Sequence, residues 1–105
     1  MAEYIDDVRK FDSDADEQVV DKIVKRLGIA LRGRDSRTVS CSSESELKTV
    51  RKNWCEKRLE LSESDAESTI EKVCERMKGV NSKSRVTFYY LCAAESGQLD
   101  KVRNL

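Results

Sequence analysis

Histidine is absent from this chain of 105 residues. Because imidazole is the commonest general base and the commonest transition-metal ligand in proteins, its absence excludes the catalytic and metal centres that depend on it. Proline is absent too, and glycine occurs at four positions. A chain with no proline and few glycines favours helices over a turn-rich β-fold.

The chain also lacks an excess of either charge, since 20 basic residues balance 20 acidic ones. It therefore has no overall field that would attract nucleic acid or an anionic membrane. No hydrophobic run approaches the ~20 residues that span a bilayer. The first residues, M-A-E-Y-I-D-D, contain no apolar core of a signal peptide. We therefore predict a cytoplasmic protein that does not enter a membrane.

The cysteines, at positions 41, 55, 74 and 92, lack any C-x-x-C pair. In a reducing compartment we expect free thiols. Four thiolates would suffice for zinc, but the wide spacing lacks the close pairs that preorganise such a site. We predict that Cys55, Cys74 and Cys92 pack in the core, and that Cys41, near several arginines, is modestly reactive. No metal and no cofactor is predicted.

Apolar periodicity predicts five helices, over residues 2–10, 15–31, 43–59, 64–78 and 82–96. The last contains V86-T-F-Y-Y-L-C-A-A94, which is apolar almost all round. Its β-branched and aromatic start also fits a strand, but its length and the following Gly97 favour a helix. The prediction is an all-α single-domain bundle, residues 1–105, with this helix at its centre and residues 98–105 as a loosely ordered tail.

Local signals place the helix ends. We expect three capping boxes, Asp14 with Glu17, Ser43 with Glu46, and Ser64 with Glu67. Lys78-Gly79 is a typical helix stop, whereas Gly28 falls inside the second predicted helix. The stretch R37-T-V-S-C41 alternates weakly and predicts a short extended piece.

Charge is segregated along the chain. Acids are in excess in residues 1–31 and 59–80, and bases in residues 32–58 and 81–105. We expect segments of opposite sign to pack side by side. Exposed ion pairs contribute only ~0–1 kcal/mol each, so the pattern should bias topology more than it stabilises.

Several sequence segments, taken together, resemble one known family. They are V24-K-R-L-G-I-A-L-R-G-R-D35, V39-S-C-S42, V50-R-K-N-W-C-E-K-R-L-E-L-S-E-S-D-A66, V73-C-E-R-M-K78 and K83-S-R-V-T-F-Y-Y-L91. The family consists of small, mostly bacterial proteins known as domain of unknown function 2853. The resemblance covers nearly the whole chain up to Gly97. The resemblance implies a compact, mainly helical single domain, and it assigns no catalytic or binding residues to this chain.

A basic elbow, R32-G-R-D-S-R37, separates the second and third predicted helices. Arginine forks bind oxyanions, and more bases follow, so these residues could converge on one anion-binding or nucleic-acid-binding face. The candidates are Arg32, Arg34, Arg37, Lys48, Arg51, Lys52, Lys83 and Arg85. The favoured alternative is that the elbow arginines cap helix carbonyls and pair with acids near the N-terminus. No fixed-spacing phosphate motif is present.

Two other features have a structural and a functional interpretation. K83-S-R85 opens a predicted helix, where backbone amides attract anions. We favour Ser82 or Ser84 as the N-cap, with the bases reaching out to water. The rings of Trp54, Tyr89 and Tyr90 could stack on a ligand, but at helical spacing a core position is favoured.

Calcium binding finds no support in the residues. D12-S-D-A-D16 resembles the start of a calcium loop, but Glu17 and Ile23 stand where that loop needs glycine and glutamate. We predict a cytoplasmic non-enzymatic protein that binds an unknown protein partner or associates with itself, and no catalytic residue. The alternative is an anion-binding or nucleic-acid-binding protein that uses a basic face around residues 32–58 and 83–85. An enzyme is the third and least favoured interpretation, and it would need carboxylate, lysine or cysteine chemistry in a formed pocket.

Overall fold

A computed structural model describes residues 2–28, 38–80 and 83–104. Within these ranges the chain is mainly helical, which confirms the predicted all-α bundle. The elements in chain order are α1 (Ala2–Arg9), α2 (Glu17–Leu27), β1 (Thr38–Val39), α3 (Glu44–Val50), the π-helix η2 (Arg51–Glu56), α4 (Glu63–Arg76), β2 (Lys83–Ser84), α5 (Arg85–Glu95) and α6 (Leu99–Arg103). No helix in this part of the chain is long and apolar enough to cross a bilayer.

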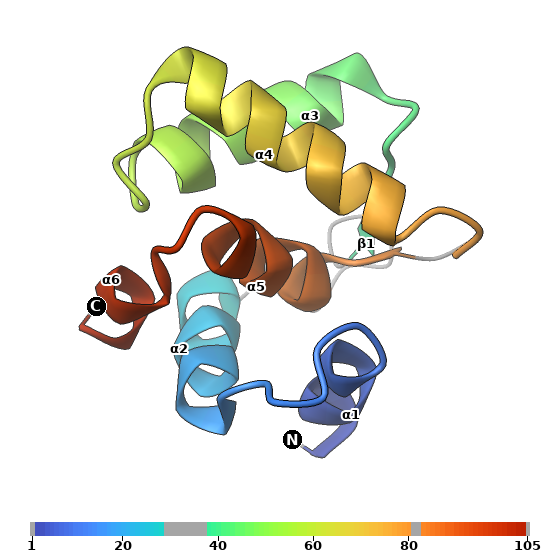
Figure 1. The fold of residues 1–105 in the computed structure, drawn as a ribbon, viewed down its shortest axis with the longest axis vertical. Coiled ribbons are helices and arrows are strands. Elements are labelled where there is room, and N and C mark those ends of the chain that lie inside the picture. Colours follow the sequence, from blue (N-terminus) through green and yellow to red (C-terminus); the bar gives the residue numbers. More distant parts are fainter. Residues whose placement is uncertain (1, 29–37, 81–82, 105) are drawn as a thin grey trace.

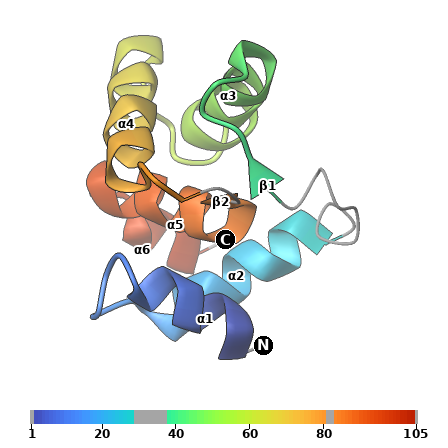
Figure 2. The same cartoon turned by 90° about the vertical axis from the view of Figure 1, so that its right-hand side faces the viewer.

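Helix α5 lies at the centre of the molecule (Figure 1). Every residue from 85 to 93 is buried. Helices α1 and α2 lie on one side of α5, and α3 and α4 on the other (Figure 2). A helix covered from several sides must be apolar nearly all round, as this one is. The predicted central helix is thus confirmed, although it begins at Arg85 because residues 83–84 form β2.

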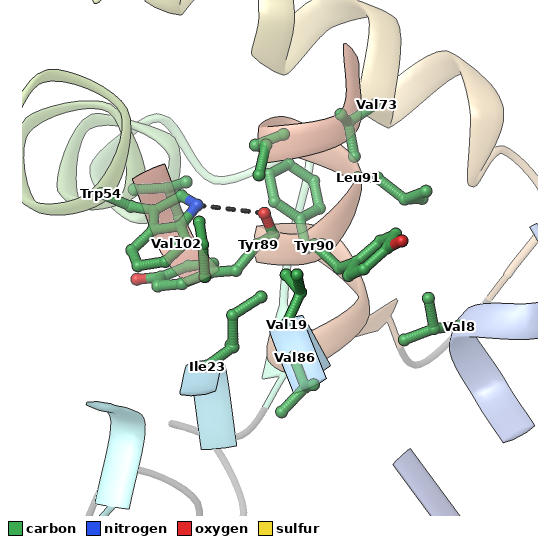
Figure 3. Close-up of a cluster of buried hydrophobic side chains, with 14 of the residues drawn as sticks. Val8, Val19, Ile23, Trp54, Val73, Val86, Tyr89, Tyr90, Leu91 and Val102 are labelled. Carbon is green, nitrogen blue, oxygen red and sulfur yellow. Dashed lines mark hydrogen bonds between the residues drawn. The ribbon is translucent and has the colours of Figure 1, made fainter. Parts of the chain in front are cut away.

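The core gathers side chains from the surrounding helices onto α5 (Figure 3). The Trp54 indole stacks on the Tyr89 ring, with 4.8 Å between ring centroids. Its Nε1–H donates to the backbone oxygen of Tyr89 at 3.0 Å. Trp54, Tyr89 and Tyr90 are at most 6% exposed. The prediction that these rings belong to the core is confirmed.

The strands β1 and β2 form a short antiparallel pair, in which Thr38 lies opposite Ser84 and Val39 opposite Lys83. The extended piece predicted within residues 37–41 is therefore confirmed over its described part. Ser84 occupies the N-cap of α5 without a side-chain capping bond, and Ser82 lies outside the described residues. The pairing carries the chain directly into the central helix.

Of the three predicted capping boxes, two are wrong and the third forms only in part, since the Ser43 amide donates to the Ser40 oxygen at 3.2 Å rather than to Glu46. Asp16, rather than Asp14, caps α2 and accepts from the Gln18 amide at 2.9 Å. Ser43 caps α3 as predicted, accepting from Glu46 at 3.3 Å.

Helix α4 is capped by Ser62, which accepts from the Asp65 amide at 3.2 Å. Both S62-E-S-D65 and S64-D-A-E67 fit the sequence pattern of a capping box. Local sequence alone does not choose between two such overlapping patterns, so the predicted start at Ser64 was two residues late.

Two predicted helices are interrupted. Gly28 ends α2 with φ +43°, a conformation that glycine adopts easily, so the predicted continuation to residue 31 is wrong at Gly28 and otherwise lies outside the described residues. The helix predicted over 43–59 changes at Arg51 into η2. There the Leu59 amide donates to the Trp54 oxygen five residues back, at 2.9 Å. This wider turn lets the consecutive residues Trp54 and Cys55 both enter the core.

Residues 99–103 form the helix α6, where the sequence predicts a loose tail. Val102 is fully buried. The Gln98 amide donates to the Ala93 oxygen at 2.8 Å, across the turn at Gly97. The helix therefore folds back onto the bundle beside α2 (Figure 1).

Ion pairs connect the segments of opposite charge excess, as expected from the sequence. Arg103 pairs with Asp16 at 2.6 Å, joining α6 to the start of α2. Lys101 pairs with Glu60 at 3.0 Å. These contacts tie the last segment to two acidic ones.

Candidate functional site

Helices α3 and α4 lie on the side of α5 away from α1 and α2 (Figure 2). An open groove lies between α3 and α4. We refer to it as the α3/α4 groove. Its volume is about 530 Å³, and it is lined by Glu44, Leu47, Lys48, Arg51, Glu67, Ile70 and Glu71. Leu47 is half-buried and Ile70 is buried. The groove therefore has an apolar floor between charged walls.

The α4 wall is acidic. Four exposed glutamates, spaced four residues apart, form a ridge along one side of this helix; we call Glu63, Glu67, Glu71 and Glu75 the acidic ridge. Like charges at this spacing destabilise a helix by about 0.2–0.5 kcal/mol per pair. Glu63 lies in the first turn of α4, where an acid is favourable, but helix formation gives no such reason for Glu67, Glu71 and Glu75, which are exposed.

The opposite wall is mainly basic. Lys48 and Arg51 line the groove there, and Lys52 follows them just outside its lining; we call these three residues the basic wall. Lys48 and Lys52 are exposed. Arg51 is already engaged, since its Nη1 lies 2.9 Å from a Glu56 carboxylate oxygen and 3.1 Å from one of Glu63. Glu44 is the one acidic residue lining this side. The two walls therefore carry opposite charge.

Two links join α4 to the chain around α3. Arg51 and Glu63 pair where η2 is followed by α4. Cys41, just before α3, forms a disulfide with Cys74, near the end of α4, with 5.9 Å between the Cα atoms. The hairpin that makes the groove is thus tied at both ends.

The disulfide overturns the prediction that all four cysteines are free thiols. The sequence spacing between Cys41 and Cys74 suggests no pairing, because they meet only when α4 runs back alongside α3 and brings its last turn beside β1. A disulfide enclosing 33 residues contributes about 3–4 kcal/mol of stability in the chain-entropy account. The predicted reactivity of a Cys41 thiolate does not apply to the bonded sulfur.

Cys55 and Cys92 are free and buried, so their predicted place in the core is confirmed. Burial raises the pKa of the Cys92 thiol well above its ordinary value, and the neighbouring Cys55 thiol raises it further. A thiol that stays protonated is a poor nucleophile. In the described ranges, no group of three or more cysteine and acidic side chains is arranged to hold a metal ion.

The predicted anion-binding face is described only in part. Arg32, Arg34 and Arg37 lie outside the described residues. Lys48 and Lys52 are exposed on the α3/η2 surface. Their neighbours across the groove are acids, so the surface that they belong to is of mixed sign.

The three remaining candidates make contacts within the fold, and those of Arg51 with Glu56 and Glu63 are described above. The Lys83 ammonium donates to the Val80 oxygen at 2.9 Å. The Arg85 side chain is only 7% exposed, and it pairs with Glu46 at 2.7 Å. Its guanidinium lies 5.8 Å from the Tyr89 ring centre. The expectation that Arg85 reaches out to water is wrong, because a carboxylate and a ring satisfy it inside the protein.

A second polar cluster joins α2, α5 and α6. Hydrogen bonds from Arg103 lower the pKa of Asp16 below its ordinary value. The Asp16 amide donates to the Tyr90 hydroxyl at 3.0 Å, and burial raises the pKa of Tyr90. Each polar group here has a partner within the fold, so the cluster serves packing.

Comparison with known proteins agrees with the resemblance drawn from the sequence. A family model described as a protein of unknown function (DUF2853) matches residues 3–100. No curated protein matches the chain.

Proposed function

Because the chain belongs to the DUF2853 family, whose description names no activity, we propose a role from its own surface: a non-enzymatic protein-interaction module that docks its partner in the α3/α4 groove. The observation that carries this proposal is the pairing of an acidic and a basic wall over an apolar floor. Apolar area supplies affinity in such interfaces. Complementary charge speeds association and selects the partner.

The reactive side chains are bonded, buried or paired within the fold, which supports a non-enzymatic role. Two sulfurs are joined in a disulfide, and the other two are buried. The buried guanidinium of Arg85 is held by Glu46. These groups serve the fold, whereas Lys48, Glu67 and Glu71 in the groove are exposed to a partner.

The charge of the groove favours a protein over a nucleic acid. Phosphates would be attracted by Lys48 and Lys52, but repelled by Glu67 and Glu71 across the same groove. A protein surface can offer both signs of charge, and so can match both walls.

The cytoplasmic location and bacterial origin expected at first remain predictions. The Cys41–Cys74 disulfide is of a kind that persists mainly in oxidising compartments, and it argues against a cytoplasmic location. Cell fractionation with an antibody against the protein decides the question.

The docking role is tested by capture from native lysate with tagged protein, with and without nuclease. The groove variant is Glu67→Lys/Glu71→Lys, and the matched control is Asp6→Lys/Asp21→Lys, which makes the same charge change on α1 and α2 across the molecule (Figure 2). We expect proteins that the wild type and the control retain and the groove variant loses, regardless of nuclease. The lysate contains the untagged chain, so a captured second copy counts as a retained protein. Equal capture by all three proteins, or loss on nuclease treatment alone, would reject the proposal.

A further inference from the structure

We infer that the occupant of the α3/α4 groove is a second copy of this chain, a step that rests on the docking role proposed above. The inference comes from the way charge is divided between the two walls. In a two-fold dimer the same patch is used by both copies, so the patch must complement itself. A groove with one acidic and one basic wall meets that condition.

The direction of the two-fold axis follows from the positions of the walls. An axis running along the groove places α4 of each copy over α3 of the other. Glu67 and Glu71 of one copy then face Lys48 of the second copy, because these residues line the same stretch of groove. An axis running across the groove would set acids on acids and bases on bases. Charge therefore selects the first arrangement.

The charges needed for this contact are still available. Lys48, Glu67 and Glu71 are exposed. Among the described residues, none of the three takes part in an ion pair. The exposed Lys52, four residues after Lys48, extends the basic wall. Pairing across the axis would form each contact twice, and would cover the half-buried Leu47 of both copies.

The hollow between α1 and α2 lacks this division of charge. It is lined by Ile5, Asp6, Arg9, Glu17, Asp21, Val24 and Lys25. The acid and the base on the α1 side cancel, and acids are in excess on the α2 side, so the two sides do not carry opposite charge. The hollow serves as the control surface for the same reason.

Exposed ion pairs are screened over about 10 Å at 0.1 M salt, so the association should be salt-sensitive. We expect sedimentation velocity to show a dimer whose population rises with protein concentration and falls as salt is added. Glu67→Lys/Glu71→Lys makes both walls basic, and Lys48→Glu/Lys52→Glu makes both acidic. Each variant alone should raise the dimer dissociation constant by about tenfold or more, because like charges then face each other.

The decisive sample is a one-to-one mixture of the two variants. An all-basic groove complements an all-acidic one, so the mixture should recover the dimer that neither variant forms alone. The controls Asp6→Lys/Asp21→Lys and Lys25→Glu/Arg26→Glu make equal charge changes at exposed positions of α1 and α2. Both should dimerise like the wild type. Circular dichroism of every variant checks that the helices are intact.

Three results would overturn the inference: a wild type that stays monomeric at every concentration, a dimer indifferent to both charge reversals, or no recovery in the mixture. The capture experiment tests the proposed function separately. If the wild type is monomeric but still retains a lysate protein that Glu67→Lys/Glu71→Lys loses, the groove docks another protein and only the self-association fails. If that retention is also absent, both fail.

Discussion

The Arg85 guanidinium lies 2.7 Å from the Glu46 carboxylate, although 39 residues separate them in the sequence. The same guanidinium donates to the Thr38 oxygen at 3.2 Å. Because Glu46 belongs to α3 and Arg85 begins α5, the pair fixes one wall of the groove to the central helix. The position of the groove thus depends on a charge held inside the protein.

We predict that Glu46→Ala destabilises the protein by about 2–4 kcal/mol, because it leaves the buried Arg85 charge without its carboxylate. The double variant Glu46→Ala/Arg85→Met should be more stable than the single one, since it removes the charge as well. Urea denaturation of both measures the difference. A double variant less stable than Glu46→Ala would show that the guanidinium is held mainly by its other contacts.

The hydroxyl of Tyr90 provides a second prediction. It accepts a hydrogen bond from the backbone amide of Asp16, in a half-buried position at the start of α2. Tyr90→Phe leaves that amide without its partner and should lower the free energy of unfolding by about 1 kcal/mol. The control Tyr4→Phe alters a half-buried ring with no hydrogen bond among the described contacts, and should change stability by less than about 0.5 kcal/mol. Equal effects would contradict the assigned bond.

The Asp16–Arg103 pair predicts a pH dependence. The hydrogen bond from Arg103 lowers the Asp16 pKa in the folded protein, so folding favours the ionised carboxyl. Its contribution is therefore present above the unfolded-state pKa of about 3.9, and is lost as the pH falls through the lower folded value. Asp16→Asn should be less stable than the wild type at neutral pH, and the gap should close in acid. A gap that stays constant from neutral pH to strong acid would exclude this linkage.

Thiol counting tests the sulfur chemistry. Without reductant, native protein should resist alkylation, and unfolded protein should take up two labels, at Cys55 and Cys92. With reductant, the unfolded chain should take up four. Cys41→Ser/Cys74→Ser should cost about 3–4 kcal/mol of stability, from the loop that the disulfide closes. Mass spectrometry showing four labels without reductant would mean that Cys41 and Cys74 are not bonded.

The features predicted from sequence are those set by local pattern. The run from Val86 to Ala94 is apolar on all sides, and such a helix has no stable place except the centre of a bundle. Ser43 caps α3 by accepting from the Glu46 amide, a contact that four consecutive residues are enough to set. The family resemblance also followed from collinear phrases along the chain.

The features that were missed depend on contacts between distant segments. Cys41 and Cys74 meet only after α4 has run back alongside α3. The change to η2 follows from the packing of Trp54 and Cys55, and no residue type marks it in advance. The acidic ridge is visible as a spacing of four, but its opposition to Lys48 needs the hairpin to be folded. The sequence pattern of either helix alone therefore does not predict the groove between them.

The most direct test of the groove as a docking surface is residue-resolved amide spectroscopy as the isotope-labelled protein is concentrated at low salt. If the groove docks a second copy, shifts will be confined to α3, η2 and the facing side of α4, will centre on Lys48, Glu67 and Glu71, and will be absent from Glu67→Lys/Glu71→Lys. Shifts centred instead on α1 and α2, or persisting unchanged in that variant, would contradict it.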